Sequence, residues 1–150
     1  MKTRDILFLF VILLTLGGLF FYFNYAPPAD DELDYHPVDV GGGSLTIADQ
    51  DQTNLVVFGA TLAAPGFVTI HESMSGAPAA VIGTSEYLPA GTHEMVVISL
   101  DEFMTPGYSY IALLHADNGD EAFVMEEDFP VIVDGTVVKT SFVTMPESVE

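Results

Sequence analysis

The sequence predicts an all-β extracellular domain behind a single N-terminal transmembrane helix. The domain is expected to be an antiparallel, immunoglobulin-like or cupredoxin-like β-sandwich of about eight strands. From Ser44 onward, short runs rich in Val, Ile, Thr, Tyr and Phe alternate with turn residues. No stretch beyond Tyr25 keeps a 3.6-residue period, and strands at this spacing are typical of a sandwich of about 100 residues.

The transmembrane helix is predicted from Ile6–Phe23, an uncharged run of 18 residues that follows Lys2 and Arg4. A spanning helix needs about 20 apolar residues, and basic residues mark the cytoplasmic side. We therefore expect residues 1–5 to be cytoplasmic and residues 6–25 to be an uncleaved signal anchor in the cell membrane. A cleaved secretory signal remains the alternative, although its apolar region would be about 7–15 residues long.

The segment after the anchor has the composition of a linker. Residues 26–43 begin with Pro27-Pro28, contain five acidic residues and end in Gly41–Gly43. Prolines stiffen such a segment, like charges extend it and glycines loosen it. This predicts a spacer between the membrane and an ectodomain of residues 44–145, with residues 146–150 as a tail.

The strands are delimited by turn residues. Asp134-Gly135, between two apolar runs, is a strong signal for a two-residue hairpin turn. The predicted strands are Leu45–Ala48, Leu55–Thr61, Gly66–His71, Ala80–Gly83, His93–Leu100, Tyr108–His115, Glu121–Met125, Val131–Val133 and Val137–Thr144.

The charge of the chain is strongly acidic and unevenly placed. The formal net charge is −19, and of the three basic residues only Lys139 follows the apolar run. Such a surface repels nucleic acid, so we expect no nucleic-acid partner. The expected partners are the membrane, through residues 6–25, and either another surface protein or cations.

Catalytic motifs are missing from the sequence. The chain contains no Cys and no G-x-S-x-G motif, and Gly41–Gly43 lacks the lysine of a phosphate-binding loop. We therefore predict that the protein is not an enzyme.

Three histidines form the candidate metal site. His71, His93 and His115 stand at the ends of predicted strands, and Asp117 closely follows the last of them. Neutral imidazoles beside carboxylates suit zinc or copper(II), whereas a blue-copper site would also need a Cys thiolate. The alternative is that these are strand-end histidines bonded to backbone or carboxylate groups.

A second cation candidate is the acidic loop Asp117–Glu121 with Glu126–Asp128 after it. Carboxylate and backbone oxygens are the ligands that calcium prefers. The spacing does not match an EF-hand, and a solvated turn is the alternative. Zinc, copper or calcium is thus the divalent cation to test.

Several phrases of the sequence, in this order, carry a family resemblance. They are GFVTIHE (66–72), GAP (76–78), VIGTS (81–85), LPAGTHE (88–94), VVISL (96–100), YIALLHAD (110–117) and FPV (129–131). The chain resembles an uncharacterised prokaryotic cell-surface β-sandwich domain. That domain is found in haloarchaeal surface glycoproteins and exported bacterial proteins, sometimes beside cupredoxin domains.

The resemblance implies a secreted β-sandwich module without an assigned activity. His71 and His115 match recurrent positions of the family. Residues 122–130 depart from its usual Tyr-Glu-Phe-Pro-Gly phrase, so the resemblance does not define the geometry of that loop. Two functions follow as hypotheses. One is a displayed module for surface structure, adhesion or partner binding, and the other is a metal-binding or electron-transfer accessory domain.

Overall fold

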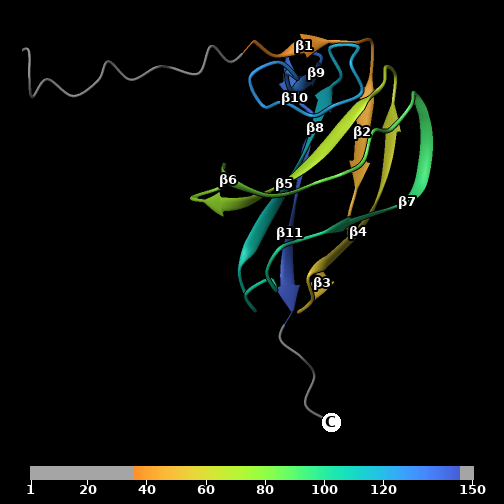
Figure 1. Cartoon of the computed structure of the whole chain (residues 1–150). Coiled ribbons are helices and arrows are strands. Elements are labelled where there is room, and N and C mark those ends of the chain that lie inside the picture. The colour runs from red at the N-terminus through yellow and green to blue at the C-terminus, as the bar shows by residue number, and fades with distance from the viewer. Residues whose placement is uncertain (1–35, 146–150) are drawn as a thin grey trace, which may run out of the picture. The chain divides into compact units, whose positions relative to one another are not determined.

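Every regular element in the described part of the chain, residues 36–145 of a computed structural model, is a β-strand (Figure 1). Within that range no helix is long and apolar enough to cross a membrane. The predicted anchor, residues 6–25, and the tail, residues 146–150, lie outside the described residues.

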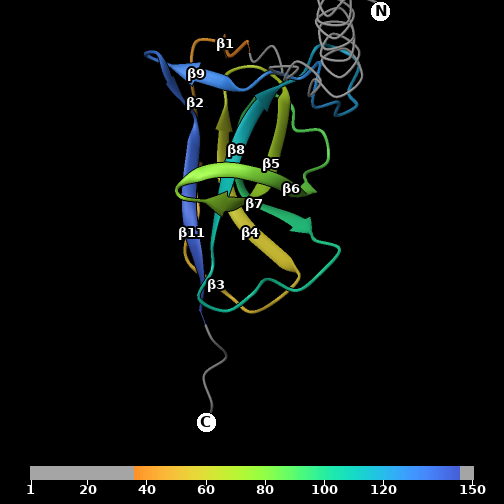
Figure 2. The same ribbon diagram turned by 90° about the vertical axis from the view of Figure 1, so that its left-hand side faces the viewer.

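Within residues 36–145, eleven strands form three sheets. The strands are β1 (Val38–Asp39), β2 (Gly43–Thr46), β3 (Gln50–Asp51), β4 (Leu55–Leu62), β5 (Gly66–Met74), β6 (Ala77–Thr84), β7 (Gly91–Ser99), β8 (Ser109–Ala116), β9 (Val131–Val133), β10 (Thr136–Val137) and β11 (Lys139–Met145). The sheet orders are β2-β4-β7, β3-β11-β8-β5-β6 and β1-β9-β10. Figure 2 shows β5, β8 and β11 running alongside one another in the five-stranded sheet.

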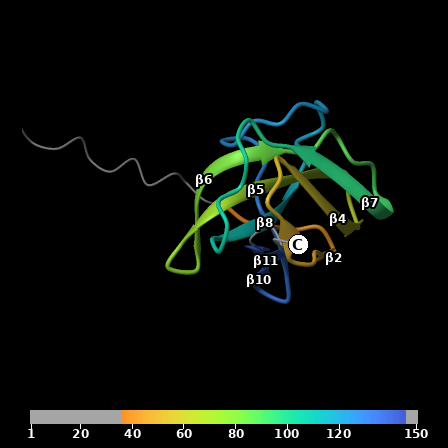
Figure 3. The ribbon, with the colours of Figure 1, turned by 90° about the horizontal axis from the view of Figure 1, so that it is seen from below.

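The core lies between the β2-β4-β7 sheet and the five-stranded sheet. The two-residue period of the strands explains which side chains enter it. On β4 the buried residues alternate with exposed ones; they are Val56, Phe58, Ala60 and Leu62. The facing sheet supplies Val68, Ile70, Ala112, Leu114 and Phe142. Viewed from below, β4 and β7 lie on one side and β5 and β6 on the other (Figure 3). Two half-buried sheets thus make one hydrophobic interior.

The central strands β5 and β8 are buried on both faces. Six consecutive residues of each strand, 66–71 and 110–115, are buried. Phe123, in the loop between β8 and β9, packs its ring edge-on against Phe67 and His115, with centroids 5.6 and 5.3 Å away. That loop therefore covers the face of β5 and β8 that points away from the core.

The all-β prediction is confirmed, and so is the hairpin at Asp134-Gly135. Both residues have positive φ, 50° and 74°, and they join β9 to β10 through the pair Val133 and Thr136. Positive φ at both central residues is the requirement of a type I′ turn.

Several details of the strand prediction are wrong. Glu121–Met125 is a loop rather than a strand, because the carboxylates around it bond to the loop's own backbone N–H groups. Val137–Thr144 is split at Val138, whose N–H donates to the Val131 carbonyl. Eight or nine strands were expected, whereas residues 36–145 contain eleven. The sheets are also not purely antiparallel, since β1 pairs with β9 and β3 with β11 in parallel. The short strand β1 also lies inside the segment predicted as a linker, residues 26–43.

Candidate functional site

The register of β5 and β8 brings two of the three candidate histidines together. Thr69 is paired with Leu113, and Phe67 with His115. Because side chains two residues apart on a strand share a face, Thr69, His71 and His115 all point to the same side of the sheet. This is the side covered by the loop between β8 and β9.

One hydroxyl group joins the two imidazoles. Thr69 Oγ1 lies 2.9 Å from His71 Nε2 and 3.2 Å from His115 Nε2. The other ring nitrogens are held by the backbone: His71 Nδ1 is 2.8 Å from the Ala79 carbonyl and His115 Nδ1 is 2.7 Å from the Asp128 carbonyl. We call Thr69, His71 and His115 the His–Thr–His cluster. Only 5% of His71, 1% of His115 and none of Thr69 is exposed.

The hydrogen-bond partners determine where the protons of this cluster lie. A carbonyl oxygen can only accept, so each Nδ1 carries a proton, and a neutral ring then has a bare Nε2. The Thr69 hydroxyl has one proton, which it can donate to His71, to His115 or, at 3.5 Å, to the Leu113 carbonyl, but to only one of them at a time. At least one imidazole Nε2 therefore lacks a donor in the cluster unless one ring takes up a further proton or a cation binds between the rings.

Burial lowers the pKa of both histidines. For His71, desolvation lowers the pKa and the bond to Ala79 partly opposes it. For His115, desolvation again dominates, His71 lowers the pKa further, and Asp128 opposes both. A second proton in the cluster is thus disfavoured, because a charged imidazolium there would lie in a low-dielectric environment beside another ring.

Asp128 organises the loop that covers the cluster. Its carboxylate is fully buried and accepts the backbone N–H of Asn118 at 3.0 Å and that of Val124 at 2.7 Å. Its carbonyl at the same time accepts from His115 Nδ1. One residue therefore fixes both the loop and the tautomer of the neighbouring ring.

The remaining predicted ligands do not join the cluster. His93 lies on β7 in the other large sheet, where its Nε2 is 2.8 Å from the Pro89 carbonyl. Asp117 Oδ1 accepts the backbone N–H of Glu121. Among residues 36–145 no group of three or more His, Asp or Glu side chains is placed to hold a metal ion.

The carboxylates of the acidic loop, residues 117–128, accept hydrogen bonds from N–H groups of the same loop. Asp120 Oδ1 accepts the N–H of Ala122, and Glu127 Oε2 accepts the side-chain amide of Asn118. Side chains of this type commonly bond to nearby backbone in turns. In the part of the chain that the structure describes, the loop is a self-bonded turn without a calcium cluster.

Thr69 and Asp128 are the residues that reasoning from the sequence missed. A signal for Thr69 existed, because the spacing Thr69-Ile70-His71 puts hydroxyl and imidazole on one face of a strand. No local signal distinguished Asp128 from the other acids of its loop.

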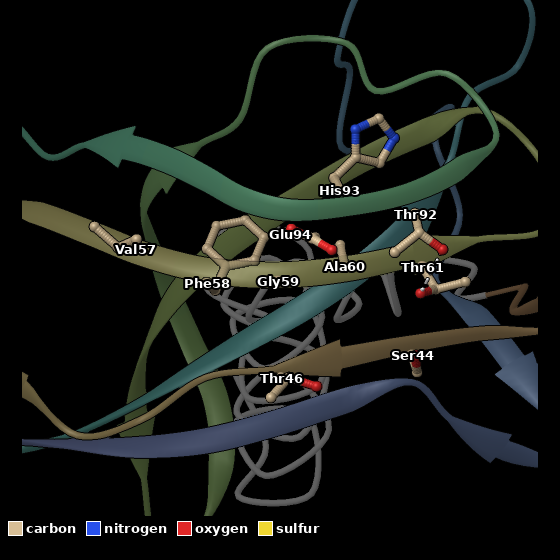
Figure 4. Close-up of a pocket in the computed structure, with 10 residues that line it drawn as sticks. All are labelled: Ser44, Thr46, Val57, Phe58, Gly59, Ala60, Thr61, Thr92, His93 and Glu94. Atoms are coloured by element: carbon tan, nitrogen blue, oxygen red, sulfur yellow. Dashed lines mark hydrogen bonds between the residues drawn. The ribbon is translucent and has the colours of Figure 1, made fainter.

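A second candidate site is the outer face of the β2-β4-β7 sheet. A shallow hollow of about 460 Å³ opens there (Figure 4). Its walls come from all three strands: Ser44, Thr46, Val57, Phe58, Gly59, Ala60, Thr61, Thr92, His93 and Glu94. The hollow lies at Gly59, which has no side chain, next to a register shift between Phe58 and Ala60.

This face is apolar next to the hollow. Leu55 and Val57 of β4 are 43% and 40% exposed, and Met95 and Val97 of β7 are 75% and 51% exposed. Val57 and Val97 are direct cross-strand partners, so their side chains form one surface. No described loop covers this face of β4 and β7, whereas the loop between β8 and β9 covers the outer face of β5 and β8.

The same face is almost uncharged. Of the many acidic residues between 36 and 145, only Glu94 lies on β2, β4 or β7. In a chain of formal net charge −19, an apolar face with a single acidic residue is well suited to contact another macromolecule.

These features describe a small acidic all-β domain that presents one uncovered sheet face among residues 36–145. The chain belongs to the family described as Domain of unknown function (DUF7282), whose model matches residues 43–144.

Two curated relatives are haloarchaeal. Cell surface glycoprotein 1 of Haloarcula hispanica is 36% identical over 115 residues, which is 74% of this chain and 12% of that protein. Cell surface glycoprotein 2 of the same organism is 40% identical over 103 residues, 67% of this chain and 10% of that protein. This chain thus spans about a tenth of each relative. No solved structure matches it.

Proposed function

We propose that this protein is a membrane-anchored module displayed at the cell surface, with its N-terminus in the cytoplasm and its β-sandwich outside. The sandwich is of the immunoglobulin-like or cupredoxin-like kind. Its role is surface structure, adhesion or partner binding rather than catalysis. The observation that carries this proposal is the neutral, uncovered face of β2, β4 and β7 in an acidic domain related to surface glycoproteins.

The distribution of charge supports a contact role for that face. Carboxylates elsewhere on the domain hold water and repel like-charged neighbours. A contact made through Val57, Met95 and Val97 removes apolar surface from water without burying a carboxylate. The acidic remainder keeps the displayed domain soluble.

The display of the module can be tested by cysteine labelling, because the chain has no native cysteine. Thr136→Cys lies on the exposed β9–β10 hairpin, and Thr3→Cys lies in the basic N-terminal segment. A membrane-impermeant maleimide applied to intact cells should label the first variant, and label the second only after lysis. Labelling of Thr3→Cys on intact cells, or protection of Thr136→Cys, would contradict the proposed orientation.

The His–Thr–His cluster favours a second candidate function, metal binding with an accessory or electron-transfer role. Both Nε2 atoms face one hydroxyl, and both Nδ1 atoms are anchored by backbone carbonyls, as in many metal-ligating histidines. His71 and His115 would be the ligands, and imidazole nitrogens suit zinc or copper. His93 and Asp117 are not part of this arrangement.

Metal binding predicts a melting shift that depends on the cluster. Zinc or copper should raise the melting temperature of the native protein, and His115→Gln should abolish the shift. His93→Gln is the matched control, since that ring lies on the other sheet and should leave the shift intact. Absence of any shift with either metal, or an equal loss in both variants, would eliminate this candidate.

A further inference from the structure

The strand β7 has an open edge. In the sheet order β2-β4-β7 it pairs with β4 alone, and only Glu94 and Met95, at a register shift, lack a partner there. No other described strand forms a ladder with its second edge. Figure 1 shows β7 as the outermost strand of this sheet. The edge therefore presents unpaired N–H and C=O groups to solvent.

This edge carries little of the protection that exposed edges usually have. Between Gly91 and Ser99 there is no proline and no lysine, and Glu94 is the single charged residue. A bulge protects the Glu94 end, because the register against β4 shifts there. Val96–Ser99 pair regularly with β4, and the second edge of the mainly apolar stretch Met95–Ser99 forms no ladder with another described strand.

Met95–Ser99 is complementary to a second copy of itself. If two antiparallel copies pair with Val97 at the twofold axis, Val96 faces Ile98 of the other copy and Met95 faces Ser99. Val57 already lies beside Val97 within each copy. The paired copies would therefore carry a row of four valines across both sheets, Val57 and Val97 of one copy followed by Val97 and Val57 of the other.

The charge on β7 itself does not oppose this pairing. Glu94 lies at the register shift, and in this arrangement the two Glu94 side chains are roughly 20 Å apart along the strands. That separation exceeds the Debye length of about 8 Å at physiological ionic strength. The acids Asp101 and Glu102 follow shortly after the paired stretch, so repulsion between the two copies comes from groups outside β7 and is open to screening by salt.

We propose that the occupant of this edge is a second copy of the chain, and that antiparallel pairing of Met95–Ser99 about Val97 joins two β2-β4-β7 sheets into one. This inference rests on the proposed function, since it names the partner of the displayed face. Because the contact joins two polyanions, it should strengthen as salt screens their repulsion. A cationic partner would show the opposite dependence on salt.

Single-cysteine cross-linking of the full chain in membranes tests the pairing. Residues paired across antiparallel strands have Cα atoms about 4.5–5.5 Å apart, within the range that a disulfide spans. Under mild oxidation, Val97→Cys should form a dimer about tenfold faster than Val143→Cys. Val143 is the matched control, because it is also an exposed valine, 40% accessible, but lies on β11 between β3 and β8.

The register has its own test. Met95→Cys mixed with Ser99→Cys should give mixed dimers, whereas each variant alone should link poorly, because its own copies lie roughly 14 Å apart. If Val97→Lys is introduced as a second substitution into both cysteine variants, linking should fall about tenfold, because two like charges then lie at the axis. Introducing Val143→Lys into both variants instead makes the same change in net charge and should not reduce linking.

Each outcome has a defined meaning. Equal linking of Val97→Cys and Val143→Cys, linking that falls as salt rises, or linking that survives Val97→Lys would overturn self-pairing. If Val97→Cys fails to link while Thr136→Cys is labelled from outside, the proposed display holds and only this inference fails. If Thr136→Cys is protected, the proposed function itself fails.

Discussion

The same substitution at two buried threonines should change stability in opposite directions. Thr69 and Thr144 are both fully buried on strands of the five-stranded sheet. The Thr69 hydroxyl contacts two imidazole nitrogens, whereas Thr144 Oγ1 has no hydrogen-bond partner among the described residues. Replacing either by valine exchanges a hydroxyl for a methyl group of nearly the same size, so packing changes little.

The magnitudes follow from what each hydroxyl does. Thr69→Val leaves a buried Nε2 without its donor, which costs about 1–3 kcal/mol, partly offset by up to about 0.8 kcal/mol for the added methyl. We expect a net loss of about 1–2 kcal/mol. Thr144→Val removes an unpaired buried hydroxyl whose desolvation costs about 1–3 kcal/mol, so we expect a gain of about 1–2 kcal/mol.

Urea unfolding and thermal melting of both variants measure the difference. A separation of about 2–4 kcal/mol corresponds to roughly 8–16 °C between their melting temperatures at about 4 °C per kcal/mol. The urea m-values should stay unchanged, because the surface exposed on unfolding is the same. Thr69→Ser keeps the hydroxyl and should recover most of the stability lost in Thr69→Val.

Two results would refute this reasoning. If Thr69→Val were neutral or stabilising, the hydroxyl would not be satisfying the histidines, and the hydrogen-bond arrangement of the cluster would be wrong. If Thr144→Val were destabilising, Thr144 Oγ1 must have a partner that the geometry of residues 36–145 does not show.

Other expectations concern pH and glycines. Because the folded-state pKa values of His71 and His115 lie below the ordinary value of about 6.5, the unfolded chain binds more protons, and the free energy of unfolding should fall as pH decreases from about 7.5 through 6.5. His115→Gln should flatten that dependence between pH 7.5 and 5.5, measured by melting, and an unchanged slope would contradict the role of the ring. Gly66→Ala should cost more than about 3 kcal/mol in urea unfolding, because its Cβ would overlap the rigid backbone carbonyl of His115. Gly83→Ala instead meets side-chain methyl groups of the buried Leu100 and Ile98, which can shift more easily than backbone, and should cost about 1–3 kcal/mol; a larger loss than for Gly66→Ala would reverse the argument.

Much of the strand framework was predictable because its signals are local. The strand Leu55–Thr61 was expected within one residue of β4, since alternate apolar side chains repeat every two residues along a half-buried strand. The turn at Asp134-Gly135 was expected from two adjacent residues that tolerate positive φ. The two-residue strands β1 and β3 left no such pattern, and their parallel pairing depends on distant segments.

The candidate sites were predictable only in part. The histidines were identified by residue type, but the pairing of His71 with His115 depends on a register between strands some 40 residues apart. The separation of His93 from them depends on which sheet β7 joins. Sequence spacing carries neither piece of information, because strand pairing is set by burial over the whole core.

By itself, the sequence determined the chemical inventory: a cysteine-free acidic chain, a basic N-terminal end before an apolar run, and alternating strands with their turns. Only the tertiary structure decided which sheet faces are covered. A loop closes the outer face of β5 and β8 over the His–Thr–His cluster, whereas the outer face of β4 and the edge of β7 remain open. The physical reason is that alternation separates the two faces of a strand, but the segment that packs against each face comes from elsewhere in the chain.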